Sequence, residues 1–270
     1  MPYPETSSLH TIWEEIAHLI DSTKDLLSLA LTCHTFKELI IPDHLHYRNL
    51  FIDIRMTGVR ESLERRLGLG RSVRSIKLLN LTETESLPLS NLTIMFAPNV
   101  SVTDTDIAFF KRAVSHMPLL KKFFWGDLGG LLPEQVIDIF HTLTTSAPYL
   151  EGLNVNLFDL MTTIRDEKQM KSLSIWSLTG LRRVVLRTTR ILSPPESPNA
   201  IQMILSCPNI EDLYSKATSH PNTFPFYMIQ RANWTKLRRL EFQELSLSNG
   251  EGSVDISAII TSFFARYSNI

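Results

Sequence analysis

The chain has 270 residues, 43% of them apolar and 20% charged, and this composition excludes disorder as the dominant state and predicts a protein with a sizeable core. Its apolar runs fall short of the roughly 20 residues that cross a bilayer, and its first residues do not resemble a secretory leader, so we expect a cytoplasmic or nuclear protein without a membrane span. The net charge of −1 divides into −4 over residues 1–50 and +3 over the remainder, without the dense basic stripe that nucleic-acid binding requires.

The segment 12–48 predicts three short helices around one small core. Apolar residues recur at three- and four-residue steps in the first helix, and 21–23 then supplies capping oxygens. The second helix, 25–31, is almost wholly apolar, and a third helix over 33–41 ends at Pro42. Three short helices cannot bury this many apolar side chains, so the segment predicts a surface for a partner. The apolar positions of the first and third helices are Ile12, Ile16, Leu19, Ile20, Phe36, Leu39 and Ile40.

This segment resembles the F-box family, most closely the F-box proteins abundant in basidiomycete fungi. The resemblance lies in the opening 12–16 (Ile-Trp-Glu-Glu-Ile), in the run 25–33, and in the apolar residues of 36–42 that end at a proline. Ser8-Leu9-His10 stands where the family usually opens with Leu-Pro.

The resemblance implies that residues 1–48 form a helical domain that binds the adaptor Skp1, and through it a cullin-RING ubiquitin ligase. An alternative is that the helices only cap the structure that follows, since terminal repeats of stacked folds need a cap. The residues that the resemblance assigns to the Skp1 contact are Ile12, Ile16, Leu26, Leu29, Cys33, Phe36 and Leu39.

Residues 58–67 predict a helix closed by the glycines of 68–70. These glycines do not predict a phosphate-binding loop, because they follow a helix and a third glycine is missing.

From residue 73 onward a pattern of three apolar residues, spaced by three and then two positions, recurs through the chain. After a gap of 47 residues, with a predicted loop over 82–103, the copies follow one another every 27 to 31 residues. Helices over 105–116, 133–146 and 200–206, each leaving at a proline, lie between them. The copies begin at Val73, Leu120, Leu150, Leu181, Ile210 and Leu237.

One strand and one helix per repeat predicts an α/β fold in which residues 49–270 form a curved, irregular leucine-rich-repeat-like solenoid with a parallel sheet on its concave face. Residues 268–270 resemble the start of another repeat, so we expect the solenoid to be truncated at its C-terminus. Residues 193–198, rich in Ser-Pro steps, predict an exposed loop that is either a plain linker or a phosphorylation site.

Strand side chains alternate, so we expect the positions between the buried ones to point to the inner, concave face of the sheet. Its mixture of aromatic, basic and amide side chains suits protein recognition, although a solvated face without a partner remains the alternative. The predicted substrate-binding residues are Lys77, Phe124, Asn154, Asn156, Arg187, Tyr214, Lys216 and Glu241.

No catalytic motif is present, and we expect neither a metal nor another cofactor. Cys33, His34, His44 and His46 do not have the spacing of a zinc site, and Cys33 and Cys207 suit buried, reduced thiols. The sequence thus predicts a non-catalytic subunit that binds Skp1 at one end and a protein substrate at the other. The alternative, favoured by the missing Leu-Pro, is an interaction scaffold without ligase coupling.

Overall fold

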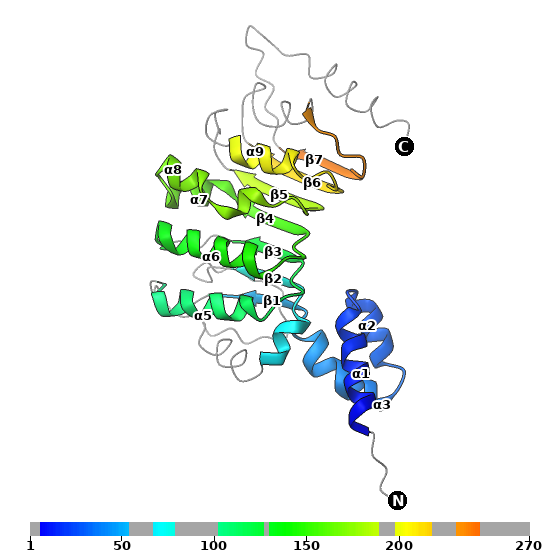
Figure 1. Ribbon diagram of the computed structural model, residues 1–270. Helices are drawn as coiled ribbons and strands as arrows, with labels where there is room; N and C mark the ends of the chain where they lie inside the picture. The colour runs from blue at the N-terminus through cyan, green and yellow to red at the C-terminus, as the bar shows by residue number, and fades with distance from the viewer. Residues whose placement is uncertain are drawn as a thin grey trace, which may run out of the picture.

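A computed structural model describes residues 6–53, 67–78, 102–126, 130–188, 198–217 and 231–243. An N-terminal unit of three helices stands beside one end of a larger α/β part (Figure 1). No helix among the described residues has both the length and the apolar character needed to cross a membrane.

The N-terminal helical unit contains α1 (Thr6–Leu19), α2 (Thr23–Ala30), α3 (His34–Ile40) and a π-helical turn, η1 (Ile41–Leu45). As the capping prediction for 21–23 required, the Ser22 hydroxyl accepts a hydrogen bond of 3.2 Å from the Asp25 amide at the start of α2. The third helix begins one residue later than expected, because Cys33 is extended and occupies the N-cap.

The larger part confirms the predicted α/β class, because it holds a seven-stranded sheet in which every pair of neighbours is parallel. The strands lie in the sheet in the order in which they occur in the chain. They are β1 (Asn49–Ile52), β2 (Ser75–Leu78), β3 (Lys122–Trp125), β4 (Gly152–Asn156), β5 (Arg183–Thr188), β6 (Asp212–Ala217) and β7 (Arg239–Gln243).

The recurring apolar pattern marks the strands correctly. Its middle residues pair with one another from strand to strand, so each copy occupies the same level of the sheet. All three positions of the recurring pattern are buried in the copies that begin at Val73, Leu120, Leu150, Leu181 and Ile210. In the copy that begins at Leu237, the first two pattern residues, Leu237 and Leu240, are only partly buried. The aligned residues are Ile76, Phe123, Leu153, Val184, Leu213 and Leu240.

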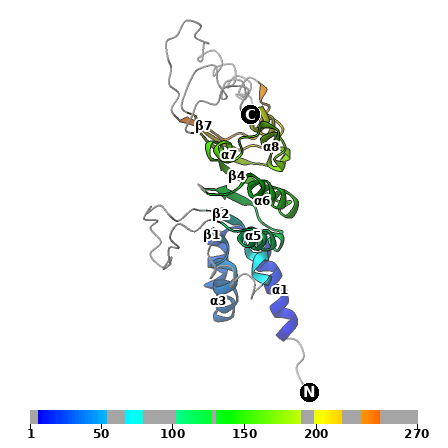
Figure 2. The same ribbon diagram turned by 90° about the vertical axis from the view of Figure 1, so that its left-hand side faces the viewer.

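Helices connect the strands and all cover the same face of the sheet (Figures 1 and 2). The predictions for 105–116, 133–146 and 200–206 correspond to three of these helices within two residues at each end. The connection from β4 to β5 holds three short elements that the sequence did not predict. The bounds are α5 (Asp104–Ser115), α6 (Pro133–Ser146), α7 (Leu157–Thr163), α8 (Glu167–Lys171) and α9 (Pro198–Leu205), with 3-10 turns η2 (Leu67–Ser72) and η3 (Ser174–Ser177).

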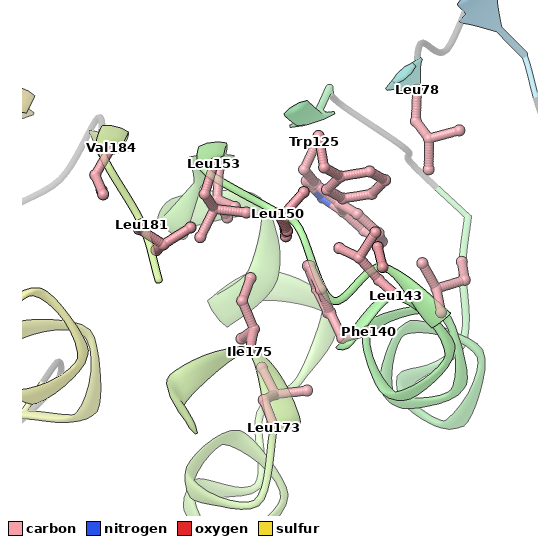
Figure 3. Packing of buried hydrophobic residues seen from close by; sticks show 14 of the residues in the cluster. Leu78, Trp125, Phe140, Leu143, Leu150, Leu153, Leu173, Ile175, Leu181 and Val184 are labelled. Atoms are coloured by element: carbon pink, nitrogen blue, oxygen red, sulfur yellow. The ribbon is translucent and has the colours of Figure 1, made fainter. Parts of the chain in front are cut away.

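The main core lies between these helices and the sheet. Trp125 of β3 stacks on Phe140 of α6 with ring centroids 4.8 Å apart, and Phe123 meets the same ring edge-on. Leu153 and Val184 point toward the same layer from the next two strands (Figure 3). Phe123 and Trp125 of β3 therefore both pack against the helix that follows their strand.

Several predictions need correction or fall outside the described residues. Cys207 is buried, but Cys33 is an exposed free thiol, because the extended N-cap conformation leaves its side chain outside the helical core. The sequence pattern also missed β1, which adds a strand before the first predicted copy. The predicted helix 58–67, the loops 82–103 and 193–198, and the expected truncation after 268–270 lie largely or wholly outside the described residues.

Gly70 lies directly against the end of α5. A Cβ atom at this position would stand 2.2 Å from the carbonyl oxygen of His116, a backbone atom that cannot swing away. Position 70 therefore requires a glycine, because the backbone of η2 and the backbone at the end of α5 approach each other closely there.

We expect Gly70→Ala to lower the free energy of unfolding by at least about 2 kcal/mol, since either η2 or α5 must move to accept the methyl group. Urea denaturation measures this loss. Gly180→Ala is the matched control, because its Cβ would meet nothing closer than the Leu150 carbonyl oxygen at 3.8 Å. Equal stability of the two variants would contradict the close approach.

Candidate docking surfaces

The helical unit has its own small core, separate from the main one. It consists of Ala17, Leu26, Ala30, Leu39 and Ile40, with Leu29 and Phe36 among the partly buried residues around it. Trp13 meets Phe36 edge-on at 4.7 Å, which ties α1 to α3. This core uses one side of α2, through two residues four positions apart.

The surface of the helical unit carries exposed apolar side chains. Leu19 and Leu31 are 79% and 70% exposed, and Ile12 is 52% exposed. Leu27 and Trp13 are also exposed large apolar residues. No other described part of the chain covers them, so the apolar excess predicted from the sequence stands at the surface.

The seven residues predicted to contact Skp1 divide into three groups. Leu26 and Leu39 belong to the core of the helical unit and are not available to a partner in this conformation. Ile16, Leu29 and Phe36 are half-buried, whereas Ile12 and Cys33 are exposed.

The residues predicted for the Skp1 contact omit two exposed leucines, Leu27 of α2 and Leu31 at the C-cap of this helix. A signal for them was present. Leu26 and Ala30 lie four residues apart on one face, and Leu27 and Leu31 repeat the same spacing one position on. A helix that is apolar all round but packs on one side only must expose the second pair.

Arg48 joins the helical unit to the sheet. It is 1% exposed and lies directly before β1. Its guanidinium donates hydrogen bonds to the carbonyl oxygens of Ser72 at 2.9 Å and Ala17 at 3.0 Å, and also to that of Ile20. Burial and the nearby Arg74 lower the pKa of Arg48 to about 10, so it stays charged at neutral pH. The cation thus satisfies carbonyls at the C-terminal end of α1, where the helix dipole favours positive charge.

Arg74 and Lys121 lie directly before β2 and β3, as Arg48 does before β1, and their side chains also bind the helical unit. Arg74 donates to the carbonyl oxygen of His18 and, through Nε at 3.2 Å, to the carboxylate of Asp21. Lys121 forms an ion pair with the same carboxylate. Burial alone would raise the pKa of Asp21, but the hydrogen bonds and charges of Lys121 and Arg74 lower it. Arg71 adds an exposed ion pair of 3.0 Å to Glu15.

Two histidines fill the space beside these arginines. His18 of α1 and His44 of η1 meet edge-on at 4.6 Å, and His44 Nδ1 lies 3.2 Å from the Ser72 hydroxyl. Burial lowers the pKa of His44 to about 4, helped by His18, Arg48 and Arg74. Burial lowers the pKa of His18 in the same direction. The pair is therefore neutral at physiological pH.

The second candidate surface is the face of the sheet that the helices leave uncovered, which we call the open face. Its central row runs from strand to strand in register, with Lys77 beside Phe124 and Phe124 beside Asn154, and it continues to Tyr214 and Glu241. A second row places Asn156, Arg187 and Lys216 side by side. All eight predicted substrate-binding positions thus lie on one face in two rows.

Exposure differs within the open face. Arg187 is exposed, whereas Lys77, Phe124, Asn154, Asn156, Tyr214 and Glu241 are partly buried. Lys216 is placed by its backbone register alone.

A shallow pocket between α7, η3 and α9 is lined by apolar side chains and Asn199, without an acid, base or nucleophile. Within the same residues, no three His, Cys, Asp or Glu side chains converge as a metal site would require. These two surfaces, the helical one and the sheet, are therefore the candidate sites.

A scan against protein-family models found no family that matches this chain, and a search of curated proteins found no significant relative.

We expect Arg48→Met to lower the free energy of unfolding by about 3 kcal/mol, because it leaves three backbone carbonyls without a donor. Chemical denaturation measures the loss. Arg238→Met is the matched control: Arg238 also directly precedes a strand but is exposed, so this variant should stay within about 0.5 kcal/mol of wild type. A loss of stability in Arg48→Met no larger than that in Arg238→Met would show that the hydrogen bonds of the Arg48 guanidinium contribute little to stability.

The histidine pair predicts a pH dependence of stability. The folded-state pKa of His44 is about 4, below the unfolded value of 6.5, so the unfolded chain binds more protons between these values and stability falls as pH drops through this window. Between pH 7.5 and 5.0, we expect wild type to lose about 2 kcal/mol more stability than His44→Gln does.

Urea denaturation at the two pH values measures this difference. His34→Gln is the control, since the His34 side chain is 80% exposed, and it should keep the wild-type loss. The same loss in all three proteins would contradict a neutral, buried His44.

Proposed function

We propose that this protein is a non-catalytic substrate-recognition subunit of an Skp1-cullin-F-box ubiquitin ligase. In this proposal the helical unit is an F-box that binds Skp1, and the open face of the sheet binds a protein substrate. The observation that carries the proposal is the exposed apolar surface of the helical unit, with Leu31, Leu19 and Ile12 at least half exposed. Such a patch on a small helical unit is the usual sign of a protein partner.

The contacts that join the helical unit to the sheet support the same function. A ligase subunit acts by holding its substrate near the transfer machinery, which raises the effective concentration of the target. That role requires a defined orientation between the docking unit and the selecting surface. The buried contacts of Arg48 and Arg74 with carbonyls of α1 provide such a connection.

The finer fold that we propose for the second part is an irregular leucine-rich-repeat-like solenoid. Its support is the strand order, which follows the chain, together with the spacing of 27 to 31 residues between successive copies from Leu120 on. In this arrangement each repeat adds one strand to the sheet.

A second candidate function is an interaction scaffold without ligase coupling. Burial of Leu26 and Leu39 favours it, because two of the seven residues assigned to the Skp1 contact instead hold the helical unit together. The absence of the opening Leu-Pro favours it as well. The cap hypothesis has weaker support, since the described side chains that bind the helical unit, Arg48, Arg74 and Lys121, lie before the strands and not along the edge of β1.

Co-expression with Skp1 followed by pull-down separates the two functions. We expect the wild-type chain to retain Skp1 and Leu31→Asp to reduce the retained amount at least tenfold, because a carboxylate would enter an apolar interface. Leu132→Asp is the matched control, since Leu132 is 57% exposed and lies at the start of α6, away from the helical unit.

Circular dichroism should show that both variants keep the wild-type fold. If the wild-type chain does not retain Skp1, the ligase proposal fails and the scaffold stands. Equal loss in both variants would place the contact elsewhere.

A further inference from the structure

Basic residues dominate the open face. Its strand positions hold six Lys or Arg and two acidic residues, Asp212 and Glu241. This excess is absent from the net charge of the chain, which is −1. The basic positions are Lys77, Lys122, Arg183, Arg187, Lys216 and Arg239.

The two carboxylates are already used within the face. Asp212 forms an ion pair of 2.9 Å with Arg183, and Glu241 forms one of 2.6 Å with Arg239. These pairs neutralise two of the cations at the β5 to β7 end. Among the described residues, no carboxylate forms an ion pair with Lys77, Lys122 or Arg187. The uncompensated charge is therefore centred between β2 and β5.

Side-chain packing keeps this charge on the surface of the face. Gly152 of β4 lies beside Lys122, and a Cβ there would stand 3.0 Å from Cγ of that lysine. The missing side chain lets the lysine stem lie over the next strand. Lys77 Nζ stands 5.9 Å from the ring centre of Phe51, a contact that leaves its charge available.

The groups between the cations suit a peptide. Asn154 and Asn156 of β4 present amides that both donate and accept hydrogen bonds, and Phe124 and Tyr214 are partly buried aromatic side chains in the central row. From β2 to β6 the face spans four strand spacings, about 19 Å, which is the length of about six residues of extended chain.

We propose that the open face between β2 and β6 binds an acidic protein segment about six residues long, whose carboxylates meet Lys77, Lys122 and Arg187. This inference rests on the proposed function in that it names the class of substrate. Charge complementarity selects the partner and speeds its association, while the amides and aromatic rings hold its backbone and apolar atoms.

A protein segment fits this face better than a nucleic acid. Along the central row, Phe124, Asn154 and Val185 separate Lys77 on β2 from Tyr214 on β6, so a phosphate backbone crossing the sheet would meet mostly neutral groups. The cations are also separated by neutral residues and do not form the continuous stripe that a phosphate backbone requires.

Fluorescence polarisation with two labelled peptides tests the proposal. The probe has eight residues in which glutamate alternates with alanine, and its control carries glutamine in place of glutamate. We expect the full chain to bind the glutamate peptide at least tenfold more tightly than the control at low salt, with weaker binding as salt rises.

Arg187→Glu should weaken binding of the glutamate peptide at least fivefold. Arg165→Glu makes the same change in charge at an exposed site between α7 and α8, on the helix side of the sheet, and should leave binding within twofold of wild type.

Three results would overturn the proposal: equal binding of the two peptides, equal weakening by the two variants, or tighter binding of an eight-residue oligothymidylate than of the glutamate peptide. The last result would assign the face to nucleic acid. Because the assay contains no Skp1, peptide binding without Skp1 retention would refute the ligase function alone, and Skp1 retention without peptide binding would refute this inference alone.

Discussion

The constraint on which the structure depends is the register of its parallel sheet. One apolar residue per strand pairs with its counterpart on the next strand, from Ile76 through Leu213, and the helices pack on the face that these residues occupy. A shift of one residue in any strand would turn its apolar side chains to the open face and its charges into the core. The positions of the helices, and of every open-face side chain, follow from this alignment.

A second regularity lies one residue before each strand. Before the first six strands, the backbone carbonyl at this position accepts two amide hydrogen bonds from the next repeat, as when Arg48 receives those of Arg74 and Ser75. The pattern continues to the acceptance by Glu211 of the Arg238 and Arg239 amides. Every residue at this position is charged. The residues are Arg48, Arg74, Lys121, Glu151, Arg182, Glu211 and Arg238.

The side chains at this position differ in what they bind. The first three are cations that hold the helical unit, whereas Arg182 pairs with Glu151 and Glu211 on its two neighbours. One backbone position thus builds a junction at one end of the sheet and a surface ion-pair chain at the other. Because the junction is formed by residues that directly precede strands, the helical unit holds a defined position at one end of the sheet (Figure 1). The two surfaces that carry the proposed function are therefore parts of one framework.

Much of the α/β part was predictable from local pattern. The apolar spacing located six of the seven strands, and the helix over Pro133–Ser146 was predicted with its bounds, because a proline begins it and Ala147-Pro148 follows it. Alternation along each strand then identified the open face, including Phe124 and Arg187. These features depend on residues close together in the chain, whose periodicity is visible in one dimension.

Tertiary structure decided which surfaces are free and how the parts are joined. The contacts of Arg48 and Arg74 with α1 link residues 31 and 56 positions apart, and Lys121 reaches Asp21 over 100 positions, so no local pattern indicates them. The same holds for the helical unit, where composition predicted an apolar excess but not that Leu26 would be buried and Leu31 exposed. By itself the sequence determined the repeat, its register and the two kinds of surface. Which side chains face solvent was decided by docking between distant segments, because burial depends on what packs against a residue and not on the residue alone.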